Sequence, residues 1–194
     1  SPGRMKHIFL AVDRDDRGNN AEAARFTAEL AGMAVTLARA NAATLHLAHA
    51  WQVYGADLLQ DPRAGLDEPT VEAYTQGRRE AERRWLDRYA GEVRQLAAGG
   101  IEVKTHMPEG AAADVVPRLL ETAGADLLVL GTVGTTAVPG LLIGPTAETI
   151  LGRVSTGVLT VKPHDFTSPL KFDRTGDTES RQAGGTIAPT REEA

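Results

Sequence analysis

The sequence predicts an α/β fold in which a doubly wound sheet of five parallel strands carries helices on both faces. Two features lead to this prediction. Five short apolar runs alternate with longer segments whose apolar residues recur at helical spacing, which is typical of a parallel sheet. The run at residues 126–130 is almost continuously apolar, as expected for a strand covered on both faces. Right-handed crossovers and a chain reversal after the third strand predict the strand order 3-2-1-4-5.

The elements follow one another with short connections. The expected strands span residues 6–13, 44–51, 101–107, 126–130 and 158–161. The expected helices span about residues 20–41, 70–98, 111–122 and 145–152. Gly99 and Gly100 are expected to end the second helix, because glycine commonly follows a last helical turn.

Helical periodicity is clearest in the first two helices. In the first, the apolar positions at helical spacing are Phe26, Leu30, Met33, Ala34, Leu37 and Ala38. In the second, the expected buried stripe is Trp85, Leu86, Tyr89, Val93 and Leu96. The spacing of Trp85 and Tyr89 is therefore that of core residues rather than of a surface on which bases stack.

The second helix also carries many charges. Its arginines are Arg78, Arg79, Arg83, Arg84 and Arg88. They alternate with Glu80, Glu82 and Asp87, which indicates a solvated helix face rather than a nucleic-acid patch. Glu80 and Arg84 are placed to pair across one turn.

Composition narrows the class of protein. The 194 residues, 42% of them hydrophobic, are enough for one domain with a real core. The net charge of −5 gives no general attraction to nucleic acid or to an anionic membrane. The absence of cysteine excludes disulfides and a cysteine nucleophile, and it suits a reducing cytoplasm.

No apolar run reaches the roughly 18 residues that span a bilayer, and no signal peptide is recognised. We therefore expect a cytoplasmic protein.

The composition changes along the chain. We expect one domain at residues 5–163, followed by a polar, flexible tail at residues 164–194, where large apolar residues are few. Residues 1–4 precede a methionine and resemble the scar of an expression tag, so they are not counted as part of the domain.

A glycine-spaced segment after the fourth strand is the most informative motif. It consists of Gly131, two residues, Gly134, nine residues, and then Gly144, Pro145 and Thr146. A glycine directly after a buried strand permits a tight turn and close approach to a ligand. A helix start after Gly144 offers free amides and a dipole that favour an anion. On spacing alone, a phosphate site and two purely structural turns are equally good interpretations.

This segment resembles the ATP-binding signature of the universal stress proteins, G-x2-G-x9-G followed by a small polar residue. The resemblance covers nearly all of residues 5–163, including ADLLVLG at 125–131 and VLTVKP at 158–163. The stretch GTVGTTAVPGLLIGPTAETIL, followed by KPHDF, is most similar to the E-type subgroup, whose members usually carry two such domains in tandem. This chain has one.

The resemblance implies a site for ATP or another adenine nucleotide, with ten lining residues. These are Ala11, Asp13, Ala50, Leu130, Gly131, Gly134, Gly144, Pro145, Thr146 and Ala147. In the family pattern, the matches on the first two strands contact the adenosine, with Asp13 also available to a sugar hydroxyl. Leu130, Gly131 and Gly134 match the loop along the ribose and the phosphates. The four matches from Gly144 to Ala147 correspond to the phosphate-binding helix start.

Two departures from the family pattern leave occupancy open. Members that bind ATP usually have serine or threonine directly after the third glycine, whereas Pro145 has no amide hydrogen there. Proline suits the first helical position, so the helix survives and one anion donor is lost. The loop between Gly134 and Gly144 also lacks a basic residue. Asp15 and Asp16 would repel phosphate unless Mg²⁺ or neighbouring arginines offset them.

Other ligand and catalytic motifs are missing or weak. The chain has no G-x-G-x-x-G after its first strand, no Walker A sequence and no G-x-S-x-G elbow. His46 and His49 are expected on opposite faces of the second strand, and no histidine pair has helical metal-ligand spacing. His49 is interpreted as a packed residue at a strand end.

Three functions compete. The first is a stress-response module that binds an adenine nucleotide and acts through protein partners, without an obvious catalytic base for hydrolysis. The second is a nucleotide-independent dimeric scaffold with a degenerate site. The third, an ATP-dependent enzyme, is weakest because no second domain is present for a substrate. The resemblance also implies a homodimer formed by pairing of the last strand, which begins at Val158 and ends at Val161, because an apolar edge needs covering.

Overall fold

The computed structural model describes residues 4–14, 21–53, 67–132 and 143–162. The expected tail at residues 164–194 lies outside the described residues, as do Asp15, Asp16 and Gly134.

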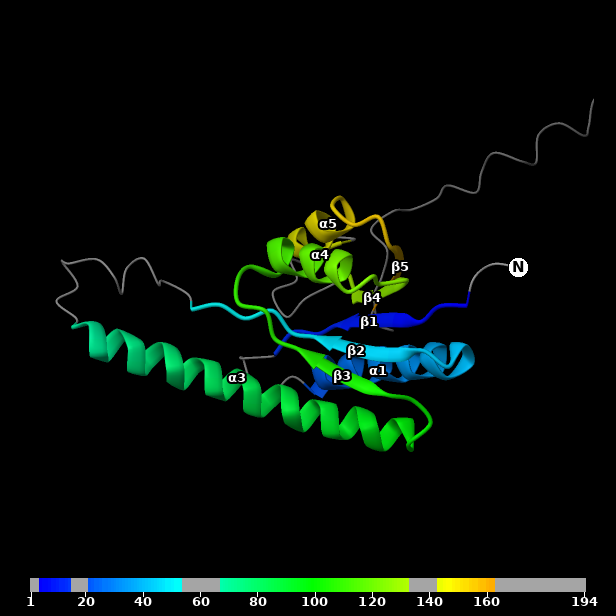
Figure 1. Cartoon of the computed structure of the whole chain (residues 1–194), viewed down its shortest axis with the longest axis horizontal. Coiled ribbons are helices and arrows are strands. Elements are labelled where there is room, and N and C mark those ends of the chain that lie inside the picture. The colour runs from blue at the N-terminus through cyan, green and yellow to red at the C-terminus, as the bar shows by residue number, and fades with distance from the viewer. Residues whose placement is uncertain (1–3, 15–20, 54–66, 133–142, 163–194) are drawn as a thin grey trace, which may run out of the picture.

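Five parallel strands form one sheet (Figure 1). They are β1 (His7–Ala11), β2 (Thr44–Ala48), β3 (Val103–His106), β4 (Leu127–Gly131) and β5 (Gly157–Val161). Their order is β3-β2-β1-β4-β5, which confirms the predicted doubly wound sheet. The central strand β1 aligns Ala11 with Ala48 of β2 and with Leu130 of β4, so β1 and β2 end at one level and β4 ends one residue further, at Gly131.

Helices cover both faces of the sheet. They are α1 (Ala21–Asn41), α3 (Glu68–Ala97), α4 (Ala112–Thr122) and α5 (Pro145–Leu151). One apolar core joins one sheet face to α1 and α3, and a second joins the other face to α4 and α5. No helix among the described residues has the length and hydropathy to cross a membrane.

The alternation of strand side chains builds these two cores. Ile8 and Leu10 of β1 point into the core under α1 and α3, whereas Phe9 between them points into the core under α4 and α5. All three are fully buried. A central parallel strand is therefore apolar at consecutive positions, which is the pattern that predicted the strands from the sequence.

Helix α3 is the longest element and extends well past the sheet at its N-terminal end (Figure 1). Its 30 residues correspond to about 45 Å. The Asp67 side chain accepts a hydrogen bond from the amide of Thr70 and caps the helix. At the other end Ala98 and Gly99 adopt positive φ, so the helix ends where the glycine pair predicted.

Two apolar residues predicted to face the core are exposed instead. Leu96 of α3 is 48% exposed and Met33 of α1 is 42% exposed. In α3 the buried line continues from Val93 to Ala97, four residues on, so Leu96 turns towards solvent. The predicted helical spacing was correct. After Val93, however, either Leu96, three residues on, or Ala97, four residues on, could be buried, and the position of the sheet decides which.

Candidate functional site

The carboxyl ends of three adjacent strands form the edge at which the predicted site lies. Beyond the level of Ala11, Ala48 and Leu130, the amide of Val12 donates to the Ala48 carbonyl over 2.9 Å. Asp13 follows Val12 and is exposed. Topology thus brings together residues from distant parts of the chain at one edge of the sheet, as predicted for a doubly wound fold.

The walls of this edge are mostly apolar. Ala11 and Ala50 are partly buried against the α4 and α5 core, and Leu130 is buried. These three come from β1, from the residues after β2 and from β4. Their side chains make the end of the sheet apolar on the face covered by α4 and α5.

The beginning of α5 is held against the end of β4. The amide of Gly144 donates to the Thr132 carbonyl over 2.7 Å. Thr132 is itself fixed to β5, because its amide and its hydroxyl both donate to the Val161 carbonyl, over 2.9 and 3.3 Å. Thr132 is buried and was not among the predicted site residues, although its position between two glycines of the motif marked the turn.

Pro145 occupies the first turn of α5, after Gly144 at the N-cap. The helix therefore begins as predicted, without an amide hydrogen at Pro145. Thr146 is exposed, whereas the Ala147 side chain is buried in the core. Ala147 can consequently offer a ligand only its backbone.

Gly131 has a structural reason to be glycine. A Cβ at this position would lie 2.9 Å from Cε1 of Phe26, a side chain of α1. Absence of a side chain at Gly131 therefore lets α1 pack closely on the end of β4. The sequence pattern indicated a tight turn and close approach to a ligand at this glycine, and it gave no sign of the contact with the helix.

A buried polar network lies beside the same edge, on the face covered by α3. The Nδ1 atom of His49 is 3.2 Å from the Val12 carbonyl oxygen, and its Nε2 atom is 3.1 Å from Oε2 of Glu82. His49 is 2% exposed and Glu82 is 3% exposed. His49 is thus the packed strand-end residue predicted from the sequence, with a partner that the sequence did not indicate.

The prediction that Glu82 belongs to a solvated helix face is wrong. Its Oε1 atom is 3.2 Å from Nη1 of Arg14 and 3.1 Å from Nη2 of Arg78. The carboxylate is buried because two arginines and a histidine surround it, which satisfies the requirement that a buried charge be paired. Glu80 and Arg84 behave as predicted, forming an exposed pair at 3.7 Å.

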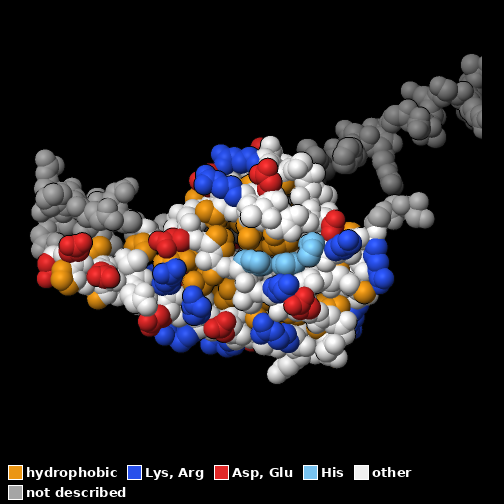
Figure 2. Space-filling view, viewed as in Figure 1, with side chains coloured by type: hydrophobic (Ala, Val, Ile, Leu, Met, Phe, Trp, Pro, Cys, Tyr) orange, Lys and Arg blue, Asp and Glu red, His pale blue; other side chains and the backbone are white. Residues whose placement is uncertain are grey.

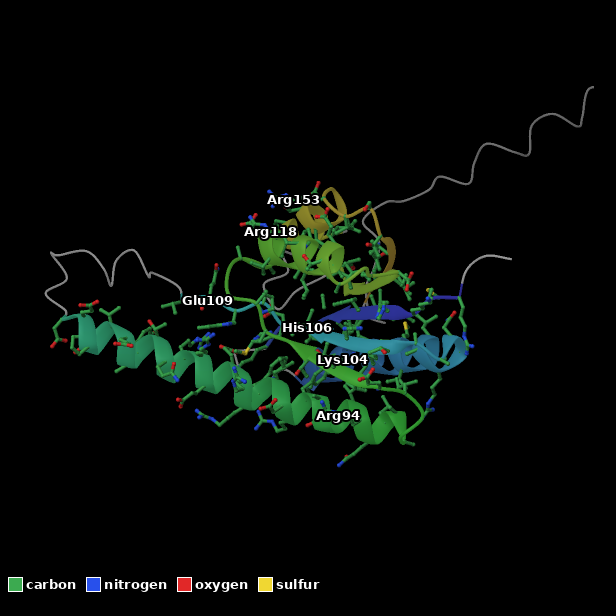
Figure 3. The ribbon with its side chains drawn as sticks, viewed as in Figure 1. Arg94, Lys104, His106, Glu109, Arg118 and Arg153 are labelled. Atoms are coloured by element: carbon green, nitrogen blue, oxygen red, sulfur yellow. The ribbon has the colours of Figure 1, made fainter. Side chains whose placement is uncertain are left out.

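On the opposite face, three histidines form a row across neighbouring strands (Figure 2). His46 of β2 lies between His7 of β1, at 3.1 Å, and His106 of β3, at 2.8 Å. Phe9 stacks on His46 with ring centroids 4.3 Å apart. His106 stands on β3 beside Lys104 (Figure 3).

Burial sets the charge of this row. It lowers the pKa of His46 to about 4, with further lowering by the neighbouring histidines and Lys104. Burial, followed by Lys104, also lowers the pKa of His106. His46, at the centre of the row, is therefore uncharged near neutral pH. No three acidic or histidine side chains of the described residues are arranged to hold a metal ion.

Comparison of the sequence and of this fold with known proteins identifies the family. The family profile of the "Universal stress protein family" matches residues 5–162. The chain belongs to the universal stress protein family. Universal stress protein E of Escherichia coli (strain K12) is 35% identical over 72 residues, which are 37% of this chain and 23% of that protein. The chain thus aligns with about a quarter of the length of this curated relative.

Solved universal stress proteins share the fold. UspA from Lactobacillus plantarum has a TM-score of 0.61 at 17% identity, over 82% of this chain and 99% of that one. A putative universal stress protein from Pseudomonas aeruginosa UCBPP-PA14 is 29% identical, with a TM-score of 0.57, over 84% of this chain and 49% of that one. A universal stress protein in complex with cAMP has a TM-score of 0.50 at 20% identity, over 83% and 99%.

In this universal stress protein domain, the nine described residues of the predicted site cluster around the ends of β1, β2 and β4 and the start of α5. The tenth, Gly134, lies outside the described residues. The prediction missed Thr132, His49 and Glu82 as parts of the edge. Among the described residues, burial and hydrogen bonding set these three apart from most other polar side chains, and His46 on the opposite face shares both features.

Proposed function

We propose that this universal stress protein domain binds an adenine nucleotide at the carboxyl edge of its sheet and acts through protein partners. One observation carries the proposal: apolar walls from three strands, an exposed carboxylate and a helix start all adjoin the same edge. Ligands of doubly wound sheets occupy this edge, where the strand order reverses.

The residues at the edge suit the parts of a nucleotide. Ala11, Ala50 and Leu130 offer apolar contact for the base. The Asp13 carboxylate can accept hydrogen bonds from ribose hydroxyls. Phosphates would meet the backbone of Thr146 and Ala147, since the first amides of a helix have no partner within it. Bound Mg²⁺ would offset the repulsion between the phosphates and the carboxylates of Asp15 and Asp16.

The class of ligand has support from a relative. One universal stress protein of the same fold was solved in complex with cAMP, which contains adenine, ribose and phosphate. Adenine and ribose are also the parts that the walls and Asp13 would contact. We therefore expect recognition of the adenosine part first, with ATP, AMP and cAMP as the nucleotides to compare.

The direct experiment is to purify the protein without added nucleotide, denature it and identify what it releases. Calorimetric titration with ATP, AMP and cAMP, with and without Mg²⁺, then gives the affinities. Asp13→Asn should weaken binding of all three nucleotides, whereas Glu148→Gln, an exposed change in the middle of α5, should not. An empty protein that gives no heat with any nucleotide would contradict the proposal.

A second candidate function is a nucleotide-independent dimeric scaffold. Pro145 favours it, because a helix that begins with proline lacks one of the amides that bind phosphate. Strand β5 is an edge of the sheet among the described residues, and an edge strand can pair with a second copy. The scaffold would show a melting temperature unaffected by millimolar Mg-ATP, whereas a binding protein would be stabilised.

A further inference from the structure

Both ring nitrogens of His49 face atoms that accept hydrogen bonds. Nδ1 lies 3.2 Å from the Val12 carbonyl oxygen, and Nε2 lies 3.1 Å from the Glu82 carboxylate. A carbonyl has no hydrogen to donate, and an ionised carboxylate has none either. A neutral imidazole has one N–H, so one of its nitrogens would turn a lone pair towards an acceptor. Both bonds form together when the ring carries two protons, or when Glu82 carries one.

The surroundings of Glu82 decide between these two cases. Its Oε1 atom lies within 3.2 Å of guanidinium nitrogens from both Arg14 and Arg78. Arginine is always charged, and two such cations next to one carboxylate favour its ionised form. A proton on Oε2, the oxygen that faces His49, would leave Oε1 as an uncharged acceptor and remove the negative charge that both arginines face. The second proton of the pair therefore belongs on His49.

The aromatic neighbour of His49 fits a positive ring. Trp85 packs on it with ring centroids 4.7 Å apart and planes at 53°. The face of an indole is electron-rich and attracts a cation at this distance. An indole is thus a better cover for a charged imidazole than an aliphatic side chain would be.

The location of His49 gives the charge a role. His49 follows β2 and immediately precedes Ala50, while Val12 follows β1 and immediately precedes Asp13. The His49 ring joins the end of β1 to α3 through Glu82, and its backbone amide donates to the His106 carbonyl of β3 over 2.9 Å. The two residues that would contact base and ribose are therefore each attached to this network.

We propose that His49 is a buried imidazolium, held by Glu82, that positions the ends of β1 and β2 for the ligand. It is a positioning residue, since its ring is enclosed by Val12, Glu82 and Trp85 rather than facing the edge. The ligand part rests on the proposed nucleotide function. The charge of the ring does not, because it follows from contacts present without any ligand.

The first test reads the charge directly. In ¹⁵N-labelled, unliganded protein, nitrogen–hydrogen correlation spectra of the histidine rings resolve which nitrogens carry hydrogen. We expect His49 to show bound hydrogen on both nitrogens near neutral pH, whereas the pKa of about 4 predicts a neutral ring for His46 in the same sample. A His49 ring with hydrogen on one nitrogen only would overturn the proposal.

The second test removes the charge of Glu82 and keeps its shape. Glu82→Gln should leave His49 with one ring proton and shift the backbone resonances of Val12, Asp13 and Ala50. The matched control is Glu80→Gln, which changes an exposed carboxylate on the same helix and should move none of these signals. Unchanged signals in Glu82→Gln would overturn the proposal. If Glu82→Gln does not fold, the wild-type ring spectrum decides the charge.

The third test concerns the ligand. Titration with ATP should show affinity reduced roughly tenfold in Glu82→Gln, the size usual for a residue that acts without touching the ligand, and unchanged in Glu80→Gln. Equal affinity of wild type and Glu82→Gln would overturn the positioning role. If the wild type binds no nucleotide, the proposed function fails, and the backbone shifts at Val12 and Ala50 decide whether the imidazolium positions the strand ends.

Discussion

At the scale of single residues, Pro145 and Gly131 matter most for the candidate site. Pro145 determines how many amides the start of α5 can offer, and Gly131 determines how closely α1 packs on β4. Both belong to the same sequence motif. Pro145 concerns the proposed ligand site and Gly131 concerns the fold, so substitutions separate the two roles.

Changing Pro145 to serine should strengthen ATP binding. Serine restores one backbone amide and adds a hydroxyl, and a hydrogen bond to a charged group contributes about 1.5–3 kcal/mol, or roughly ten- to a hundredfold in affinity. Calorimetric titration checks the affinity, and the melting temperature shows that α5 persists. Affinity equal to that of the wild type would mean that the missing amide is not what limits binding.

Changing Gly131 to alanine should destabilise the domain by about 1–3 kcal/mol, the usual cost of overpacking a core. The new Cβ would lie 2.9 Å from the Phe26 ring. Urea unfolding measures the effect. Gly91→Ala in α3 is the control, since its Cβ meets nothing within 4 Å and it should stabilise the helix slightly.

A double variant tests the assigned cause of the Gly131 effect. Phe26→Leu shortens the side chain that the new Cβ approaches, so Gly131→Ala should cost less in its presence. If the two substitutions add without coupling, the contact with Phe26 is not the reason for glycine at this position.

At the scale of elements, the histidine row across β1, β2 and β3 links the stability of the sheet to pH. The pKa of His46 is about 4 in the folded protein, whereas the ordinary histidine value of 6.5 applies to the unfolded chain. Between these pH values His46 binds more protons in the unfolded chain than in the folded protein. Its contribution to the free energy of unfolding is therefore complete above pH 6.5 and decreases as pH falls towards 4. The lowered pKa of His106 acts in the same direction.

The expected loss of unfolding free energy from His46 is about 3 kcal/mol over this range, since one unit of pKa corresponds to 1.36 kcal/mol. Because His106 acts in the same direction, the contribution of His46 is measured as the difference between wild type and His46→Phe in urea unfolding at pH values above 6.5 and near 4. His46→Phe, which fits the stack with Phe9, should flatten the dependence between these values. A pH profile identical to that of the wild type would exclude His46 as the titrating group.

At the scale of the whole molecule, β5 is the last strand of the sheet, and no described strand pairs with its outer edge. Thr160 is exposed on this strand, and a lysine there would place like charges near each other if two copies paired along β5. We expect sedimentation velocity to show a dimer for the wild type and a monomer for Thr160→Lys. Ser155→Lys, an exposed change just before the strand, should remain dimeric. A wild-type monomer at tens of micromolar would end the homodimer proposal.

Much of the fold was predictable because it depends on local pattern. Apolar runs, helical spacing and the glycines after α3 indicated the elements, and the handedness of crossovers restricted their order. Strand ends were less predictable: β2 ends at Ala48, although the apolar pattern continues to Trp51, because the ladder with β1 ends there. The exposure of Leu96 and Met33 likewise depends on where neighbouring elements lie.

The amino-acid sequence by itself determined the family, the strand order and the edge at which a ligand would lie, since these follow from short-range pattern and one glycine-spaced motif. Only the tertiary structure revealed the partners of His49 and the reason for Gly131. His49 and Glu82 are 33 residues apart, and Glu82 alternates with arginines as a solvated residue would. Burial among Arg14, Arg78 and His49 gives its charge a different role, and burial is a property of packed elements rather than of any segment alone.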